Sequence, residues 1–115
     1  MLGDILQKII KEGITGMYTT KKIYRETRQL ITEDKHIFKL NYFLTQKQNE
    51  ETNKSVFGVA VTKEASGVFE EEIVDNLFYQ QQEAEVILAT LANNLVTPIC
   101  LVEIVDELVT GMMNQ

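Results

Sequence analysis

Cys100 is the only cysteine of this chain, and its position is the clearest chemical signal in the sequence. It follows Thr97 and Pro98, residue types that favour the N-cap and the first position of a helix. The pattern predicts Cys100 in the first helical turn, where the partial positive charge of the helix end favours a thiolate. Glu103 and Glu107 lie on the same side, and their negative charges disfavour the thiolate. We therefore favour the interpretation of Cys100 as a small apolar side chain beneath a neighbouring helix, and a reactive thiol is the alternative.

His36 is the only histidine, so it is the only candidate for the base that a nucleophilic cysteine needs. It follows Glu33 and Asp34 at the predicted start of a strand. We expect a turn or edge histidine paired with a carboxylate, with a catalytic role as the alternative. One histidine and one cysteine are too few for a structural zinc site. No glycine-rich phosphate loop or nucleotide fingerprint is present, so the sequence predicts no cofactor and no enzymatic activity.

Three consecutive glutamates, Glu70, Glu71 and Glu72, are the candidate for a divalent metal site. In a strand, Glu70 and Glu72 point to one face of the sheet and Glu71 to the other. Two carboxylates without further oxygen ligands make a weak site for a hard cation. We therefore predict no metal here and interpret the run as a solvated sheet face that also protects a strand edge from aggregation.

Four bases near Tyr18 and Tyr24 form the one pattern that favours a nucleic-acid contact. The bases are Lys21, Lys22, Arg25 and Arg28. Cations bind phosphates and aromatic rings stack on bases, so this segment supports the hypothesis of a nucleic-acid-associated regulator. A net charge of −6 and a pI near 4.8 argue against general nucleic-acid binding. Pairing with acidic residues of this chain or of a second copy is the simpler interpretation.

The charges are divided sharply along the chain at Lys63. All 11 lysines and arginines lie at or before this position, whereas residues 64–115 contain ten acids and no base. The acidic half must find its counter-charges in the N-terminal half, in a second copy or in another molecule. The solvent face of the last predicted helix, which carries Glu103, Asp106 and Glu107, is therefore a candidate interaction surface.

The N-terminal residues predict a short amphipathic helix over residues 2–12. Its apolar residues recur at helical spacing and form one stripe. They are Leu2, Ile5, Leu6, Ile9 and Ile10. A helix this short is marginal alone in water, so the stripe must dock on the same domain, a second copy or a partner. We interpret residues 13–20 as a linker and residues 21–115 as a single domain.

Period-2 patterns predict a sheet of three or four antiparallel strands in the middle of the chain. The candidate segments are residues 23–31, which alternate poorly, and residues 38–44, 56–62 and 68–74. Residues 46–54 are polar and turn-like. In the third segment Phe57, Val59 and Val61 lie on one face. Gly58 and Ala60 lie on the other, where their small size predicts the close approach of another layer.

Two helical patterns follow the strands. The first stripe runs from Ala84 to Leu95, and a second helix begins near Thr97 and Pro98. The second stripe consists of Leu101, Val102, Val105, Leu108, Val109 and Met112. The sequence thus predicts an α+β fold in which two C-terminal helices cover one face of the sheet.

The segment from Phe57 to Leu108 resembles a small family of uncharacterised proteins from clostridia and related Firmicutes. The resemblance rests on the Phe57-Gly58-Val59-Ala60-Val61 strand, Val74-Asp75, Glu85, Ile87-Leu88, Leu91, Thr97-Pro98, Leu101, Val105-Asp106 and Leu108. It implies a bacterial source and a domain of unknown function, and it implies no catalytic residues.

The composition is typical of one soluble domain, with 44% hydrophobic and 24% charged residues. No apolar stretch approaches the roughly 20 residues of a membrane helix. Charged residues interrupt the N-terminal apolar stretch, which argues against a signal peptide. A single thiol fits a reducing compartment. We therefore expect a cytoplasmic protein that binds a protein partner or itself, through the N-terminal stripe and the acidic helix face.

Overall fold

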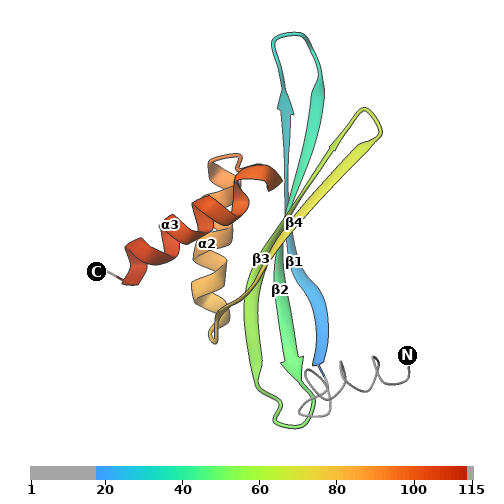
Figure 1. Ribbon diagram of the computed structural model, residues 1–115. Helices are drawn as coiled ribbons and strands as arrows, with labels where there is room; N and C mark the ends of the chain where they lie inside the picture. The colour runs from blue at the N-terminus through green and yellow to red at the C-terminus, as the bar shows by residue number, and fades with distance from the viewer. Residues whose placement is uncertain (1–17, 114–115) are drawn as a thin grey trace, which may run out of the picture.

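The computed structural model describes residues 18–113, which form a four-stranded antiparallel sheet followed by two helices (Figure 1). The strand order β1-β2-β3-β4 follows the chain, so each strand pairs with its sequence neighbour. The elements are β1 (Tyr18–Ile31), β2 (Ile37–Asn49), β3 (Ser55–Ala65), β4 (Val68–Phe78), α2 (Gln81–Asn93), the 3₁₀ turn η2 (Pro98–Cys100) and α3 (Leu101–Met113). The predicted α+β class, with an antiparallel sheet and two C-terminal helices, is confirmed.

Alternation in β2 and β3 creates the apolar face of the sheet. In the pairing of these strands Tyr42 lies opposite Val61, and Leu44 lies opposite Val59. All four side chains are buried. They face the helices, which lie together on one side of the sheet (Figure 1). The predicted orientation of the odd-numbered β3 residues is thus confirmed.

Helix α2 supplies the other half of the core. Its buried residues recur at spacings of three and four, the period of one helix face, and they are Ala84, Ile87, Leu88, Leu91 and Ala92. Beyond its end, the chain is tied to the sheet by a buried hydrogen bond of 2.9 Å, which the Tyr42 hydroxyl donates to the Val96 carbonyl. The helical layer is therefore held by both apolar packing and one buried polar contact.

Helix α3 is less deeply packed than its sequence predicts. Only Leu101 and Val105 are buried in it, whereas Ile104, Leu108, Val109 and Met112 are half-buried. Val102, expected in the apolar stripe, is 56% exposed. Among residues 18–113, neither helix combines the length and the apolar character needed to cross a bilayer.

The start of this helical segment also differs from the prediction. Residues 98–100 form a 3₁₀ turn, and the α-helix begins only at Leu101. Thr97 has the extended backbone of an N-cap, but its side chain makes no capping hydrogen bond. Cys100 thus lies in a tight turn that leads into α3, rather than in the first turn of a regular α-helix.

The sheet face opposite the helices carries a row of polar side chains. Thr27 Oγ1 donates to Asn41 Oδ1 at 2.9 Å, and Asn41 Nδ2 donates to Thr62 Oγ1 at 3.2 Å and to Glu64 Oε2 at 3.1 Å. Asn41 and Thr62 are buried. Because each of these hydrogen bonds joins two strands, the row favours one register of β1, β2 and β3.

Gly58 lies on this polar face, where the sequence predicted a second layer. The close approach instead comes from the backbone of β4. A Cβ atom on Gly58 would lie 2.3 Å from the Val74 carbonyl oxygen and 2.9 Å from the Asp75 Cα. The β3–β4 register shifts between Phe57 and Val59, so the glycine accommodates a bulge within the sheet.

Strand boundaries also extend beyond the predicted ones. Residues 18–20, expected in a linker, already belong to β1, and residues 46–49, expected in a turn, belong to β2. β4 continues past residue 74 to Phe78. The N-terminal stripe of Leu2, Ile5, Leu6 and Ile9 lies outside the described residues.

Candidate functional site

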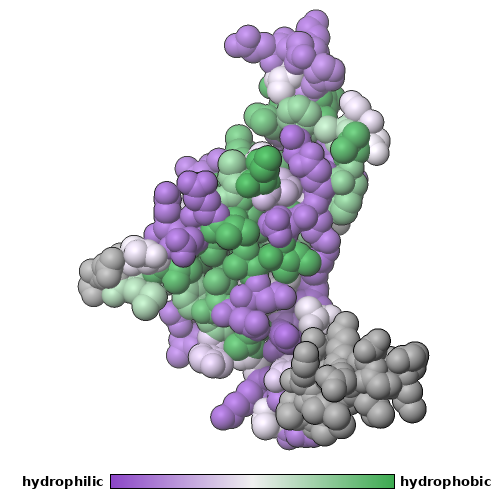
Figure 2. All heavy atoms as spheres, in the orientation of Figure 1, coloured by the Kyte–Doolittle hydropathy of each residue, from purple (hydrophilic) through white to green (hydrophobic). Residues whose placement is uncertain are grey.

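The outward side of η2 and α3 combines acidic and apolar residues. The acids are Glu103, Asp106 and Glu107, and all three are exposed. Ile99 is 88% exposed, Val102 56% and Met113 79%. We call these six residues the outer face of α3. In Figure 2 apolar residues form a band across the middle of the helical side that continues toward the C-terminal end.

The acids of this face have no counter-charge within residues 18–113. None of the ion pairs of that part of the chain involves Glu103, Asp106 or Glu107. Glu103 lies in the first turn of α3, where the helix dipole stabilises a negative charge. The last turn contains no base. The predicted solvent position of the three acids is confirmed, and no base of the described residues forms an ion pair with them.

The basic segment of residues 21–28 lies in β1, at one edge of the sheet. Lys22 Nζ lies 2.7 Å from Glu71 Oε2 of β4, and it also lies 4.4 Å from the centre of the Phe43 ring. Arg28 pairs with Glu26 at 2.7 Å. Lys21 is exposed and makes no ion pair with the described residues. Part of this positive charge is therefore neutralised within the chain.

The Lys22–Glu71 pair joins the two edge strands across the polar face. Lys22 belongs to β1 and Glu71 to β4, with two strands between them. This contact supplies one counter-charge from the N-terminal half to the acidic half of the same chain. Both side chains are partly exposed, so the pair contributes only about 0–1 kcal/mol to stability.

The three glutamates of β4 take the alternating positions expected of a strand. Glu70 and Glu72 lie opposite Lys63 and Val61, on the helix-covered face, whereas Glu71 lies opposite Thr62 on the polar face. Residues 68–73 are all exposed. Within residues 18–113, no group of three potential ligands is arranged to hold a metal ion.

The structure does not bring the two catalytic candidates into contact. His36 Nδ1 lies 2.7 Å from Asp34 Oδ2 in the β1–β2 turn, which matches the carboxylate pairing expected from the sequence. Asp34 also accepts a hydrogen bond from Thr32, and this bond lowers the pKa of the Asp34 carboxyl. Cys100 is exposed in η2, so the interpretation as a buried apolar filler is wrong.

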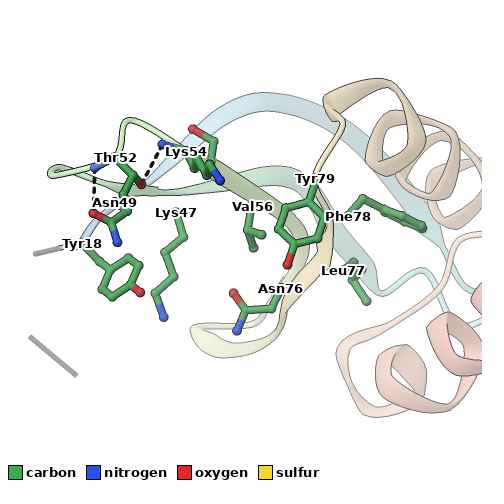
Figure 3. A pocket seen from close by; sticks show the side chains of 11 residues that line it. Tyr18, Lys47, Asn49, Thr52, Lys54, Val56, Asn76, Leu77, Phe78 and Tyr79 are labelled. Carbon is green, nitrogen blue, oxygen red and sulfur yellow. Dashed lines mark hydrogen bonds between the residues drawn. The ribbon is translucent and has the colours of Figure 1, made fainter. Parts of the chain in front are cut away.

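A half-open cavity of about 530 Å³ lies at the end of the sheet near the β2–β3 turn (Figure 3). It is lined by Tyr18, Lys47, Asn49, Thr52, Lys54, Ser55, Val56, Asn76, Leu77, Phe78 and Tyr79. Lys47 Nζ lies 4.8 Å from the centre of the Tyr18 ring. The described residues of the lining include no carboxylate or histidine, so these side chains offer hydrogen bonding and cation–π contacts rather than paired acid–base groups.

Sequence reasoning did not anticipate this cavity, because its lining comes from the start of β1, the β2–β3 hairpin and the end of β4. One local signal was present. Asn76 has a positive φ of 59°, a conformation in which asparagine is enriched, and an asparagine late in a strand pattern indicates an irregular backbone. Such a signal predicts a bend but does not indicate which surfaces the bend brings together.

These observations define a small α+β protein whose antiparallel meander carries two C-terminal helices on one face. The chain belongs to a family of unknown function, DUF6514, with a match over residues 21–111. The match begins in β1, so it extends beyond the C-terminal half on which the sequence resemblance rested. No curated protein and no solved structure is significantly similar to the chain.

Proposed function

We propose that this protein is a non-catalytic interaction module that binds a protein partner through the outer face of α3. The observation that carries the proposal is the exposure of Ile99 and Val102 beside three acids that have no ion pair within residues 18–113. An exposed apolar patch that is rimmed by polar residues is typical of an interaction surface. The partner surface is basic and offers an apolar pocket or ridge.

Both parts of the outer face have a physical role in such binding. Burial of Ile99 and Val102 supplies most of the affinity, because removal of apolar area from water is the main favourable term in association. The acids Glu103, Asp106 and Glu107 attract basic partners and raise the association rate, more strongly at low salt. The predicted N-terminal stripe, Leu2, Ile5, Leu6 and Ile9, remains a second candidate surface.

Affinity capture from the native host tests the proposal with three baits. They are the full chain, the triple variant Glu103→Gln, Asp106→Asn, Glu107→Gln, and a control in which Glu33, Glu50 and Glu51 become Gln. The control removes the same charge from exposed turn positions. We expect one protein that the full chain and the control retain and the α3 variant loses. Its purified form should bind about tenfold more weakly to the α3 variant.

A second set of baits separates the apolar part from the charged part. Val102→Ser should weaken binding of the captured protein at every salt concentration, whereas the charge variant should matter mainly at low salt. Val86→Ser makes the same change at a 58% exposed position of α2 and is the matched control. Equal capture by all baits, or no capture by any, contradicts the proposal. Loss of capture only by a further bait that lacks residues 1–17 assigns the function to the N-terminal stripe instead.

The second candidate function is a nucleic-acid-associated regulator that uses residues 21–28. The exposure of Lys21 and of Tyr24, which is 49% exposed, favours it. The ion pairs of Lys22 and Arg28 weaken it, since they occupy cations that phosphates would need. A labelled single-stranded oligonucleotide that shifts at low salt and is released steeply as salt rises would support this function. No shift even at low salt removes it.

The source and the location remain predictions of the sequence. The resemblance to clostridial and other Firmicutes proteins supports a bacterial source, and the single thiol supports a cytoplasmic location. Detection of the protein in the soluble fraction of a fractionated native host would test the location.

A further inference from the structure

Both edges of the sheet are open along the described chain. β1 and β4 stand at the two ends of the strand order, so each pairs with only one of the described strands. Residues 68–73 of β4 are all exposed, and so are residues 18–22 of β1. The other edge of each strand offers backbone N–H and C=O groups that another strand can pair with.

The two edges carry opposite charge. β1 contains Lys21, Lys22, Arg25, Arg28 and one acid, Glu26. β4 contains four acids and no base. Pairing of β1 with a second β1, or of β4 with a second β4, would place like charges opposite one another, which destabilises a sheet. Pairing of β1 with β4 places opposite charges together.

We propose that copies of this protein associate head to tail, with the β1 edge of one copy hydrogen-bonded antiparallel to the β4 edge of the next. The direction of the strands allows this arrangement. β1 and β4 run in opposite directions within one sheet, so a second copy added in the same orientation places its β1 antiparallel to the first copy's β4. This surface is distinct from the outer face of α3, and the inference does not depend on the proposed function.

One register keeps the two faces of the extended sheet continuous. It places Lys21 of one copy opposite Glu72 of the next and Thr20 opposite Ile73. Thr20 and Ile73 both lie on the polar face, because they pair with Lys47 and Ala60 within their own sheet.

In the same register Lys21 and Glu72 lie on the opposite side of the sheet. Both are exposed and make no ion pair with the described residues of their own chain. The association between copies does not require Lys22 and Glu71, because these two residues already pair within one copy. The Lys21–Glu72 contact between copies is therefore the ion pair on which a test is built.

Disulfide trapping tests the register directly. In a Cys100→Ser background, which removes the exposed thiol, Thr20→Cys and Ile73→Cys are made as separate proteins. Directly opposite residues in an antiparallel pair have Cα atoms about 4.5–5.5 Å apart, which suits a disulfide. We expect a mixed disulfide when the two variants are combined, and little homodisulfide from either alone. Homodisulfides as the main product would overturn the proposal.

Charge exchange on the full chain provides the second test. By sedimentation, Lys21→Glu and Glu72→Lys should each weaken self-association about tenfold, and mixing the two variants should restore it. The controls Lys54→Glu and Glu33→Lys make the same charge changes in turns and should associate like the unmodified chain. Association should also weaken when salt rises from about 0.05 M to about 1 M.

Three results would overturn the proposal. The first is that the protein stays monomeric at every concentration up to about millimolar in low salt. The second is that none of the edge variants changes self-association. The third is that the double variant Glu103→Gln, Glu107→Gln abolishes self-association. The last result would assign assembly to α3. Because the edge variants leave the outer face of α3 intact, failure of this inference and failure of the proposed function are distinguishable.

Discussion

Gly58 is the residue at which one added methyl group should have the largest effect. Alanine there would place Cβ 2.3 Å from the Val74 carbonyl oxygen, a backbone atom that moves only with its strand. We expect Gly58→Ala to lower the free energy of unfolding by about 1–3 kcal/mol in a urea titration. Gly111→Ala, with no heavy atom within 4 Å, is the control and should raise it by about 0.5–1 kcal/mol. Equal effects would contradict the tight β3–β4 contact.

Tyr42 carries the buried polar link between sheet and helices. Tyr42→Phe removes the donor and leaves the Val96 carbonyl without its partner. We expect a loss of about 1–2 kcal/mol in the free energy of unfolding. Tyr79→Phe, at an 82% exposed position, should have little effect. An unchanged urea midpoint for Tyr42→Phe would mean that water replaces the hydroxyl.

Alkaline pH offers an independent probe of the same residue. Burial raises the pKa of Tyr42 to about 12, compared with about 10 in an unfolded chain. The folded state thus favours the neutral phenol. This contribution to stability is complete below pH 10 and is lost as pH rises through 12. The difference in unfolding free energy between the natural chain and Tyr42→Phe should therefore be smaller at about pH 11 than at about pH 9. The same difference at both pH values would contradict the raised pKa of Tyr42.

At the scale of elements, helix α3 is anchored by its first turns. Leu101 is fully buried, whereas the adjacent Val102 is 56% exposed. We expect Leu101→Ala to cost about 2–5 kcal/mol in a urea titration because it leaves a cavity in the core. Val102→Ala should stay within about 0.5 kcal/mol. Similar losses at both positions would mean that the outer face of α3 is covered.

Periodicity predicted the existence and type of most elements and missed their ends. The alternation around Leu40, Tyr42 and Leu44 marks β2 because one face is buried and the other is polar. β1 alternates poorly because it is an edge strand, in which every described side chain is exposed or half-buried. A bulge between Lys22 and Tyr24 interrupts its register near the point where sequence reasoning placed the start of the strand, which was too late. Pairing with a neighbouring strand extends β1, β2 and β4 into polar residues that have no pattern of their own.

At the scale of the molecule, the described part of the chain has a hydrophobic core of its own. Within residues 18–113, all buried residues of this core lie between Leu40 and Val105. We expect a chain that begins at Tyr18 to unfold cooperatively in urea. Its circular dichroism spectrum should keep the β-strand signal of the full chain. Broad, non-cooperative unfolding of the shortened chain would show that the N-terminal stripe completes the core.

The candidate sites were predictable only where they depend on one element. Exposure of Glu103, Asp106 and Glu107 follows from helix periodicity alone, and the sequence predicted it. The Lys22–Glu71 pair and the cavity at the β2–β3 turn depend on strand order and curvature, which no local pattern specifies. The charge division at Lys63 indicated that the counter-charges of residues 64–115 come from outside that segment, but it did not indicate which edge of the sheet supplies them.

The meander has a consequence for how this chain folds. Every strand finds its partner next to it in sequence, so each hairpin closes only a short loop, and the entropic cost of closure is low. The helices bring distant residues together, since the Tyr42–Val96 hydrogen bond joins residues 54 positions apart. During synthesis the four strands leave the ribosome before the residues that cover them. The nascent sheet therefore exposes Tyr42, Leu44 and Val59 until α2 and α3 emerge.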